Sequence, residues 1–264
     1  MDQDNIFRPY DEIKDNLKFI TSSDVRMKII LSLKNDKKKL SDLKKDINIS
    51  SSTILHNMRQ LESNKIIKKE FQDYSLSQIG EIIAQNIMNM IQSIYFTKKN
   101  EDYWLNHEIN GIPENLISKL DYLEGSLILE NERKNKLFNE SLDNTEDIKW
   151  IFSNFDKNIL FDNIINKKKN IDLIFAEDSL IDILNIRDEN KNNSFNIMTL
   201  WRYNSPLKLN MILLDDLMCL NLPNINSNHE NRFCLVDESK KGIEWGNKLF
   251  EHYMNRSNEF INYY

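Results

Sequence analysis

The 264-residue chain has only five glycines and four prolines, while 29% of its residues are charged. Because both residues interrupt helices, their scarcity predicts a fold rich in helix. No run of about eighteen apolar residues occurs, so we expect no membrane span. The N-terminus is acidic and polar, without the basic-then-apolar start of a secretory signal. We therefore expect a cytoplasmic protein with no membrane partner.

Motifs of catalytic and metal-binding proteins are also missing. The sequence contains no glycine-rich phosphate loop, no His-Glu-x-x-His and no Gly-x-Ser-x-Gly. Its two cysteines, Cys219 and Cys234, and its four scattered histidines offer no zinc spacing, so we expect reduced, structural thiols. These absences predict a protein without enzyme activity, metal or cofactor.

Residues 24–80 have the pattern of three short helices followed by a two-stranded hairpin. Apolar residues recur at helical spacing along one of these helices: Leu40, Leu43 and Ile47. Asn48 then suits a left-handed position that ends the helix, and Ser50 is placed to cap the next one. The pattern predicts a winged helix-turn-helix, a fold that binds duplex DNA.

The helix that follows Ser50 has an apolar face at i, i+4 and i+7, formed by Ile54, Met58 and Leu61. We expect its opposite, polar face to read the major groove. Asn and Gln can pair with adenine, Arg with guanine, and Ser or Thr with bases or phosphates. The predicted contacts from this helix are Ser51, Ser52, Thr53, His56, Asn57, Arg59 and Gln60.

A short ribbon over residues 66–76 is the expected wing, with a turn at Phe71-Gln72-Asp73. A basic hairpin suits contact with the DNA backbone or minor groove. We predict phosphate contacts from four lysines and a further DNA contact from the return strand: Lys44, Lys45, Lys68, Lys69 and Tyr74.

Charge separates the two parts of the chain. Residues 24–70 hold twelve Lys/Arg against six Asp/Glu, about +6, although the whole chain carries −6. Residues 81–264 hold 20 Lys/Arg against 29 Asp/Glu, about −9. A local basic excess predicts that the first third binds double-stranded DNA and that the rest does not bind nucleic acid. A winged helix that docks on protein is the alternative.

A lead helix is expected over residues 6–20, with Ile6, Ile13, Leu17 and Ile20 on one side. A longer helix is expected from Ser77 or Gln78 to about Thr97. Its apolar seam consists of Ile79, Ile83, Ile87, Met90 and Ile94, with Ile82 and Ile91 beside it. Such a seam packs either on the chain's own second domain or on the same helix of a partner. We favour a homodimer through residues 79–95, because most winged-helix operators are two-fold.

The remainder alternates between strand and helix patterns and ends in a meander, which predicts an α/β domain with a mixed sheet. The expected domains are a winged helix with its lead helix over 1–76, a connecting helix and ordered linker over 77–119, and an α/β regulatory domain over 120–264. The expected strands cover 126–130, 148–152, 171–175, 195–200, 207–214 and 217–222. The expected helices run to 142 and over 156–166, 178–186 and 238–256.

The second domain offers candidates for a small-molecule pocket, since aromatic faces and one arginine suit a flat or anionic effector. These candidates are Trp150, Trp201, Arg202 and Tyr203. The alternative places Trp150 in the core and residues 201–203 in a loop. In the linker, His107 is either a ligand or a hydrogen-bonded corner residue.

An enzyme is the runner-up from another class, for instance a phosphodiesterase on a phospholipase-D-like sheet. That chemistry needs a histidine followed two residues later by lysine, which neither His229 nor His252 has. Asp215-Asp216 could hold a metal, but a tight turn uses the same residues more often.

The chain resembles archaeal, chiefly methanogen, regulators that join an ArsR-like winged helix to a FilR-type middle domain. The matching segments are Ser51-Ser52-Thr53-Ile54-Leu55-His56-Asn57 with Leu61-Glu62, Tyr74-Ser75-Leu76 leading to Gly80, Trp104-Leu105-Asn106-His107 with Gly111-Ile112-Pro113, and Gly242-Ile243-Glu244-Trp245-Gly246 with Leu249-Phe250. The resemblance implies a transcriptional regulator whose second domain is regulatory. The wing turn departs from the family's usual glycine, and the ArsR-type metal cysteines are absent.

Overall fold

The computed structural model of the chain describes residues 7–153, 170–181, 198–225 and 233–260. They form two compact units, Met1–Ile91 and Gln92–Tyr264, each with its own hydrophobic core. The long helix α5 (Gln78–Lys99) begins in the first unit and ends in the second. Among the described helices, none combines the length and the apolar character that crossing a bilayer needs.

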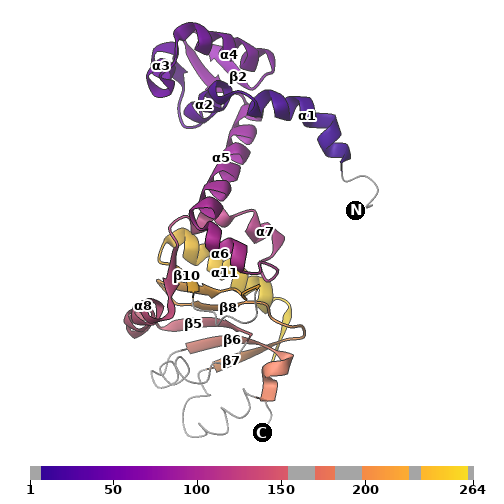
Figure 1. The fold of residues 1–264 in the computed structure, drawn as a ribbon, viewed down its shortest axis with the longest axis vertical. Coiled ribbons are helices and arrows are strands. Elements are labelled where there is room, and N and C mark those ends of the chain that lie inside the picture. Colours follow the sequence, from indigo (N-terminus) through magenta and orange to yellow (C-terminus); the bar gives the residue numbers. More distant parts are fainter. Residues whose placement is uncertain (1–6, 154–169, 182–197, 226–232, 261–264) are drawn as a thin grey trace. The chain divides into compact units, whose positions relative to one another are not determined.

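The first unit is a winged helix, as the sequence predicted (Figure 1). Its helices are α1 (Arg8–Thr21), α2 (Asp24–Ser32), α3 (Leu40–Ile47) and α4 (Ser51–Ser63), and its strands are β1 (Lys38–Lys39), β2 (Ile67–Glu70) and β3 (Asp73–Leu76). The strands form an antiparallel sheet in the order β1-β3-β2. β1 was not predicted, because two lysines in a lysine-rich connection have no strand pattern.

The turn between α3 and α4 follows the expected chemistry. Asn48 ends α3 with a φ of 56°, in the left-handed region that Asn tolerates. Ser50 caps α4, because its hydroxyl accepts a hydrogen bond from the backbone N–H of Thr53 at 3.3 Å. These two residues set the start of α4 and therefore which of its faces is buried.

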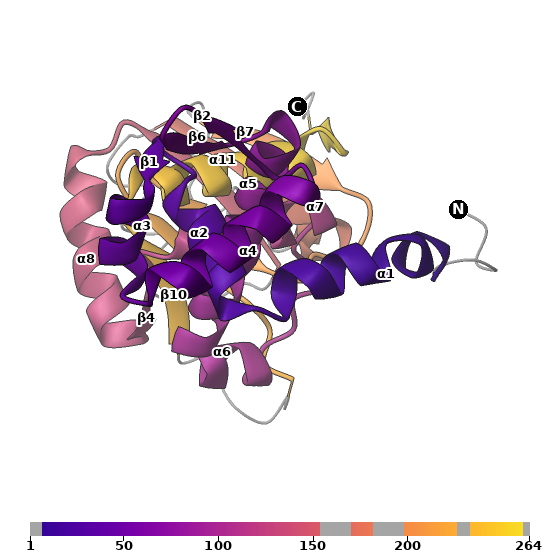
Figure 2. The same ribbon diagram turned by 90° about the horizontal axis from the view of Figure 1, so that it is seen from above.

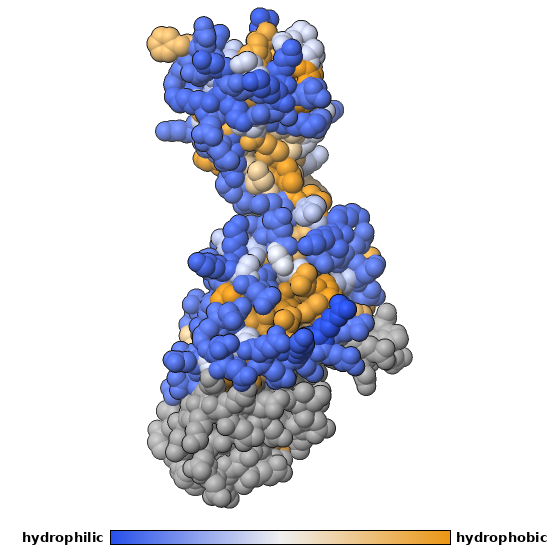
Figure 3. Space-filling view, turned by 90° about the vertical axis from the view of Figure 1, so that its left-hand side faces the viewer, coloured by the Kyte–Doolittle hydropathy of each residue, from blue (hydrophilic) through white to orange (hydrophobic). Residues whose placement is uncertain are grey.

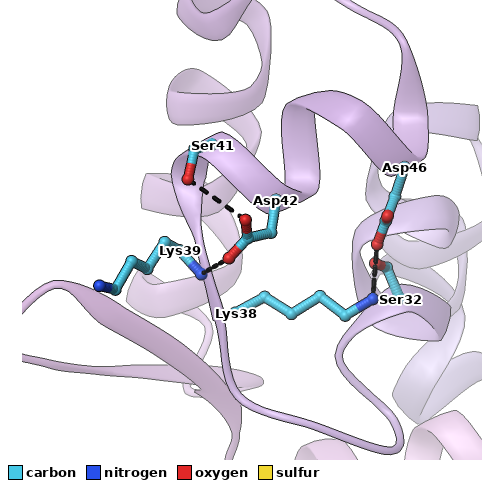
Figure 4. A network of polar contacts seen from close by, with 6 residues as sticks. All are labelled: Ser32, Lys38, Lys39, Ser41, Asp42 and Asp46. Atoms are coloured by element: carbon cyan, nitrogen blue, oxygen red, sulfur yellow. Dashed lines mark hydrogen bonds and ion pairs between the residues drawn. The ribbon is translucent and has the colours of Figure 1, made fainter.

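Polar contacts hold both ends of α3 in place (Figure 4). The carboxylate of Asp42 accepts from the backbone N–H of Lys39 at 3.1 Å, which caps the helix. Asp46 accepts from Ser32 Oγ at 2.6 Å and pairs with Lys38 Nζ at 2.5 Å, and these contacts lower the pKa of its carboxyl. The network joins α2, β1 and α3, so Lys38 serves the fold.

The lead helix α1 keeps most of its apolar side uncovered and extends beyond the α2–α4 core (Figures 1 and 2). Ile13 and Leu17 are exposed, whereas Phe19 and Ile20 pack against the core of the first unit. Ile6, which the predicted helix included, lies outside the described residues.

Gly80 allows α5 to start against the wing. A Cβ at this position would lie 2.0 Å from the backbone oxygen of Ile66, which already accepts from the N–H of Ser77 at 2.9 Å. Ile66 directly precedes β2, and its backbone carbonyl, which is held by the hydrogen bond from Ser77, cannot move aside as a flexible side chain can. The glycine in the Tyr74–Gly80 segment is therefore a packing requirement.

We expect Gly80→Ala to destabilise the protein by about 1–3 kcal/mol, despite the higher helix propensity of alanine. Chemical denaturation measures the change. Gly125→Ala is the control, because the nearest atom to its added Cβ, Ser239 Cβ, is 3.7 Å away. A stability loss at Gly125 as large as that at Gly80 would contradict the packing argument.

The second unit contains an eight-stranded mixed sheet, in the order β11-β7-β6-β5-β8-β9-β10-β4. β5, β6 and β7 pair in parallel and the other neighbours are antiparallel. The strands are β4 (Leu127–Glu130), β5 (Asp147–Phe152), β6 (Asn170–Ala176), β7 (Met198–Tyr203), β8 (Asn210–Leu213), β9 (Met218–Asn221), β10 (Phe233–Asp237) and β11 (Ser257–Glu259). The remaining elements are α6 (Glu101–Asn106), α7 (Glu114–Ile117), η2 (Leu120–Leu123), α8 (Asn131–Asn144), η3 (Glu177–Ser179) and α11 (Lys240–Met254).

Each face of this sheet has a separate core, because side chains alternate along each strand. One face carries Ile151 and Ile174 and is covered by α7, η2 and α11. The other carries Trp150 and Leu173 and is covered by α8, whose Phe138 is buried there. This arrangement confirms the predicted α/β domain with a mixed sheet.

Several predicted boundaries differ from those observed. The predicted strand 195–200 is displaced, since β7 continues through Tyr203, and its first residues lie outside the described range. The predicted helix 156–166 and most of the helix 178–186 also lie outside it. β10 and β11 were not predicted, although β10 is central enough to pair with both β9 and β4.

Candidate nucleic-acid interface

α4 is positioned by its apolar face, which lies in the core of the first unit. Ile54, Met58 and Leu61 are buried there, as the sequence predicted. The exposed side of the helix carries Ser52, Thr53, His56 and Arg59. Within the described residues, His56 and Arg59 have no intrachain hydrogen bond or ion pair, so both side chains are available to an external partner.

Asn57 does not lie on this exposed side, which corrects the sequence prediction. Its side chain is only 8% exposed. Its amide nitrogen donates to the Thr53 carbonyl at 2.8 Å, and its oxygen accepts from Ser23 Oγ at 3.3 Å. Both polar ends of Asn57 are therefore used inside the unit, where they join α4 to the start of α2.

Gln60 is half-buried and its oxygen accepts from Arg26 Nη1 at 3.1 Å. The same arginine donates to Ser22 Oγ at 3.2 Å and stacks over the Phe19 ring at 4.2 Å. Gln60, which was predicted to contact a base, therefore already uses its side-chain oxygen in a contact within the unit. Sequence reasoning did not find Arg26, because its partner lies 34 positions away and no local pattern marks the pair.

Hydroxyl groups gather at the N-terminus of α4. Ser50 Oγ lies 3.0 Å from Ser52 Oγ and 2.8 Å from Thr53 Oγ1, and Ser51 beside them is half-buried. Backbone N–H groups at a helix start and neighbouring hydroxyls are groups that phosphate oxygens accept from. The predicted contacts Ser51, Ser52 and Thr53 therefore lie together.

The lysines of the first unit are of two kinds: some form an ion pair with a carboxylate of the chain, and others form none within the described residues. Lys37 and Lys68 pair with Glu70 at 2.6 and 2.8 Å, and these two cations lower the pKa of the Glu70 carboxyl to about 2. In contrast, Lys44 and Lys45 at the end of α3 are exposed and have no ion pair within the described part of the chain. We expect these two to be the stronger phosphate ligands.

In the wing, Tyr74 is 7% exposed and belongs to the core, so its predicted DNA contact is not supported by its position. Its ring instead lies under Lys69, whose Nζ is 5.5 Å from the ring centroid. Lys69 itself is exposed. A cation held over an aromatic ring is oriented without being neutralised, so Lys69 keeps its charge for an anionic partner.

Comparison with protein families identifies both parts of the chain. Residues 14–95 match the N-terminal domain of the methanogenesis regulatory protein FilR1, and residues 132–256 match its middle domain. The chain is a member of the FilR1 family. The predicted FilR family is confirmed, whereas the likeness of the winged helix to ArsR proteins stays a prediction.

One curated relative is the methanogenesis regulatory protein FilR1 of Methanothrix harundinacea (strain 6Ac), which is 23% identical. The match covers 92% of this chain but 57% of the relative, so the chain spans little more than half of that protein's length.

Two solved structures show weaker likeness. TrmBL2, an archaeal chromatin protein, has 13% identity and a TM-score of 0.40, over 95% of this chain and 99% of that one. Nuc, a phospholipase D family member from Salmonella typhimurium, has 9% identity and a TM-score of 0.37, over 52% of this chain and 98% of that one.

In the FilR1 middle domain, the four predicted pocket residues do not come together. Trp150 is 5% exposed and stacks edge-on with Phe152 on one face of the sheet. Trp201 and Tyr203 pack against the core on the opposite face. The sheet therefore separates Trp150 from both.

Residues 201–203 also form part of a strand, not the loop that the alternative expected. β11 pairs with them, and the guanidinium of Arg202 lies 3.7 Å from the Glu177 carboxylate. The Trp201 indole N–H donates to Asp172 Oδ1 at 3.5 Å. These contacts place the segment in β7, between β6 and the edge strand β11.

Hydrogen bonds join the linker and α7 to α11, the segments that contain two of the family motifs. The Tyr253 hydroxyl donates to the Gly111 carbonyl at 2.6 Å, and burial raises its pKa to about 12. The Trp245 indole N–H donates to the Leu116 carbonyl at 3.1 Å. His107 is buried and its Nδ1 lies 2.7 Å from the Tyr103 carbonyl oxygen, so it is a corner residue.

Asp215 and Asp216 connect β8 to β9 and also have structural partners. The Asp215 carboxylate accepts from the backbone N–H of Glu146 at 3.1 Å, and that of Asp216 accepts from Ser141 Oγ. No group of three or more metal-ligating side chains is found among the described residues. His229, considered with the enzyme alternative, lies outside them.

Proposed function

We propose that this chain is a sequence-specific DNA-binding transcriptional regulator that acts in the cytoplasm. The observation that carries the proposal is the exposed side of α4, where His56 and Arg59 have no intrachain partner within the described residues. Free lysines on α3 and on the wing supply charge for phosphates beside these donors. The name of the Methanothrix relative is consistent with this role.

The structure refines which residues we propose as readers. Arg59 and His56 are the candidates for base edges, and Ser51, Ser52 and Thr53 are the candidates for phosphates near the helix start. We assign phosphate contacts to Lys44, Lys45 and Lys69, with Lys68 as a weaker contributor because it is paired with Glu70. Asn57 and Tyr74 support the fold of the reading head, and Gln60 acts with Arg26.

We also propose a homodimer through residues 79–95 of α5. Along this helix, Ala84 and Ile87 are buried in the first unit's core, whereas another set of apolar side chains remains exposed: Ile79, Ile82, Met90, Ile91, Ile94 and Tyr95. Apolar side chains gather over α5 on the face seen in Figure 3. An uncovered apolar row on a helix that leaves a DNA-binding head suits pairing with a second copy.

The middle domain is proposed as the regulatory part, which senses a small molecule or a partner. An effector would act by favouring one spacing or angle of the two reading heads. This coupling needs a difference in affinity between two arrangements of roughly 1–3 kcal/mol.

The test is fluorescence anisotropy with the duplex upstream of the protein's own gene, at two salt concentrations, with random duplex as competitor. We expect binding that survives the competitor. Six to ten phosphate contacts across two heads would weaken it roughly 10³–10⁵-fold between 50 and 200 mM salt. Binding equal to that of random DNA, or insensitive to salt, would contradict the proposal and favour a protein-docking winged helix.

A further inference from the structure

The tip of the wing contains a residue that the turn does not favour. β2 and β3 are joined by two residues, Phe71 and Gln72, between the paired Glu70 and Asp73. Phe71 adopts a φ of 57°, in the left-handed region. Hairpin turns place glycine, asparagine or aspartate at such positions, and a bulky residue there is an outlier. Glycine or asparagine would therefore adopt this backbone conformation at a lower cost in free energy than phenylalanine does.

The side chain of Phe71 makes no packing contact that would offset this unfavourable backbone conformation. It is 99% exposed, so its ring buries no apolar surface against the described residues. Single exposed apolar residues are common on proteins, and exposure alone would carry no argument. Here the exposure coincides with an unfavourable backbone conformation. The ring therefore stabilises neither the turn nor the described core, and it is free to contact a partner outside the chain.

The charges around the tip indicate an anionic partner. Lys68 and Lys69 accompany Glu70 and Asp73 on the wing, and Lys69 is exposed; Lys37 lies directly before the neighbouring strand β1. Glu70 is held between Lys37 and Lys68, so its charge is balanced locally. Duplex DNA offers both features that this tip lacks, namely phosphates for the lysines and a stack of apolar base faces for the ring.

We propose that Phe71 inserts as a wedge between stacked base pairs in the minor groove and bends the bound DNA. The inference rests on the proposed DNA-binding function and adds a mode of recognition to it. α4 would read base edges, while Phe71 would respond to how easily a step unstacks. Pyrimidine–purine steps unstack most readily, so the site beneath the wing should favour TA or CA steps.

The test compares Phe71→Asn, Phe71→Leu and Gln72→Ala with the unchanged protein on a duplex of about 30 base pairs that it binds specifically. Asn tolerates the left-handed backbone and removes the ring, whereas Leu keeps an apolar wedge. Gln72→Ala alters the neighbouring position of the same turn. Energy transfer between dyes at the two duplex ends reports the bend, and anisotropy reports the affinity.

We expect the unchanged protein to bend the duplex by roughly 20–90°, and Phe71→Asn to abolish most of that bend and weaken binding about tenfold or more. Phe71→Leu should retain most of the bend, and Gln72→Ala should match the unchanged protein. Specific binding without a bend, or an equal bend and affinity with Phe71→Asn, would overturn the wedge and leave the proposed function standing. Failure of the unchanged protein to bind duplex DNA would overturn the proposed function, and the wedge with it.

Discussion

Replacing Ile79 and Met90 together by glutamate is expected to convert the proposed dimer into a monomer. The two side chains are 56% and 45% exposed and neither belongs to a buried core of the described residues, so the substitutions leave those cores intact. They lie eleven positions apart, about three helical turns, and therefore on the same side of α5. In the proposed dimer, four carboxylates would face an apolar seam, where burying an unpaired charge is strongly unfavourable.

The loss of the dimer should also lower DNA affinity by roughly 10²-fold or more on a two-fold site, because the second head is no longer held at high local concentration. Light scattering after gel filtration measures the mass, which should fall from twice the 31.5 kDa of the chain to the single value. Anisotropy on the same duplex measures the affinity. Half-site binding by one head should change little.

Gln85→Glu is the control for added negative charge, since it introduces one carboxylate at an exposed position on a different side of α5. This variant should remain dimeric and bind as before. A double variant of Ile79 and Met90 that is still dimeric would place the interface elsewhere. The uncovered side of α1, with Ile13 and Leu17, would then be the next surface to test.

The reading head could be predicted from sequence because its signals are local. The capping serine, the left-handed asparagine and the spacing of Ile54, Met58 and Leu61 lie within a few residues of one another. Such patterns determine where a helix starts and which face it buries, largely without reference to the remainder of the fold. The structure confirms each of these features.

The roles of single polar residues were harder to predict, because they depend on distant partners. Asn57 has the chemistry of a base reader, but Ser23, 34 positions away, uses its oxygen. Gln60 is engaged by Arg26 over the same separation. A helical wheel places both residues at the edge of the polar face, and only the packing of α2 against α4 decides whether they are covered.

The pocket prediction failed for a related reason. Trp150 lies in a predicted strand, and Trp201 directly follows another. The face of the sheet that each side chain occupies depends on strand register and strand order. A side-chain period of two assigns opposite faces to adjacent residues, so an error of one position in the register of a strand reverses the face. β7 was predicted to end at 200 and instead continues through Tyr203.

Arg59→Ala and Lys45→Ala should separate base reading from phosphate binding. Both side chains are exposed, and neither has an intrachain ion pair within the described ranges. Arg59 lies on the exposed side of α4, where a guanidinium can pair bidentately with guanine. We expect its loss to cost about 1–3 kcal/mol of binding free energy and to relax the preference at one base pair.

Lys45 lies in the last turn of α3, the helix that crosses the DNA backbone in this fold. Its substitution should weaken all sequences alike and lower the salt slope by about one unit, because one fewer counterion is released. Lys68→Ala should have a smaller effect, since Glu70 already shares its charge. Anisotropy with the preferred duplex, single-base variants and random DNA, each at several salt concentrations, distinguishes the two roles. If Arg59→Ala weakened random and preferred duplexes equally, then α4 would be a phosphate-binding helix, and sequence preference would have to come from the wing.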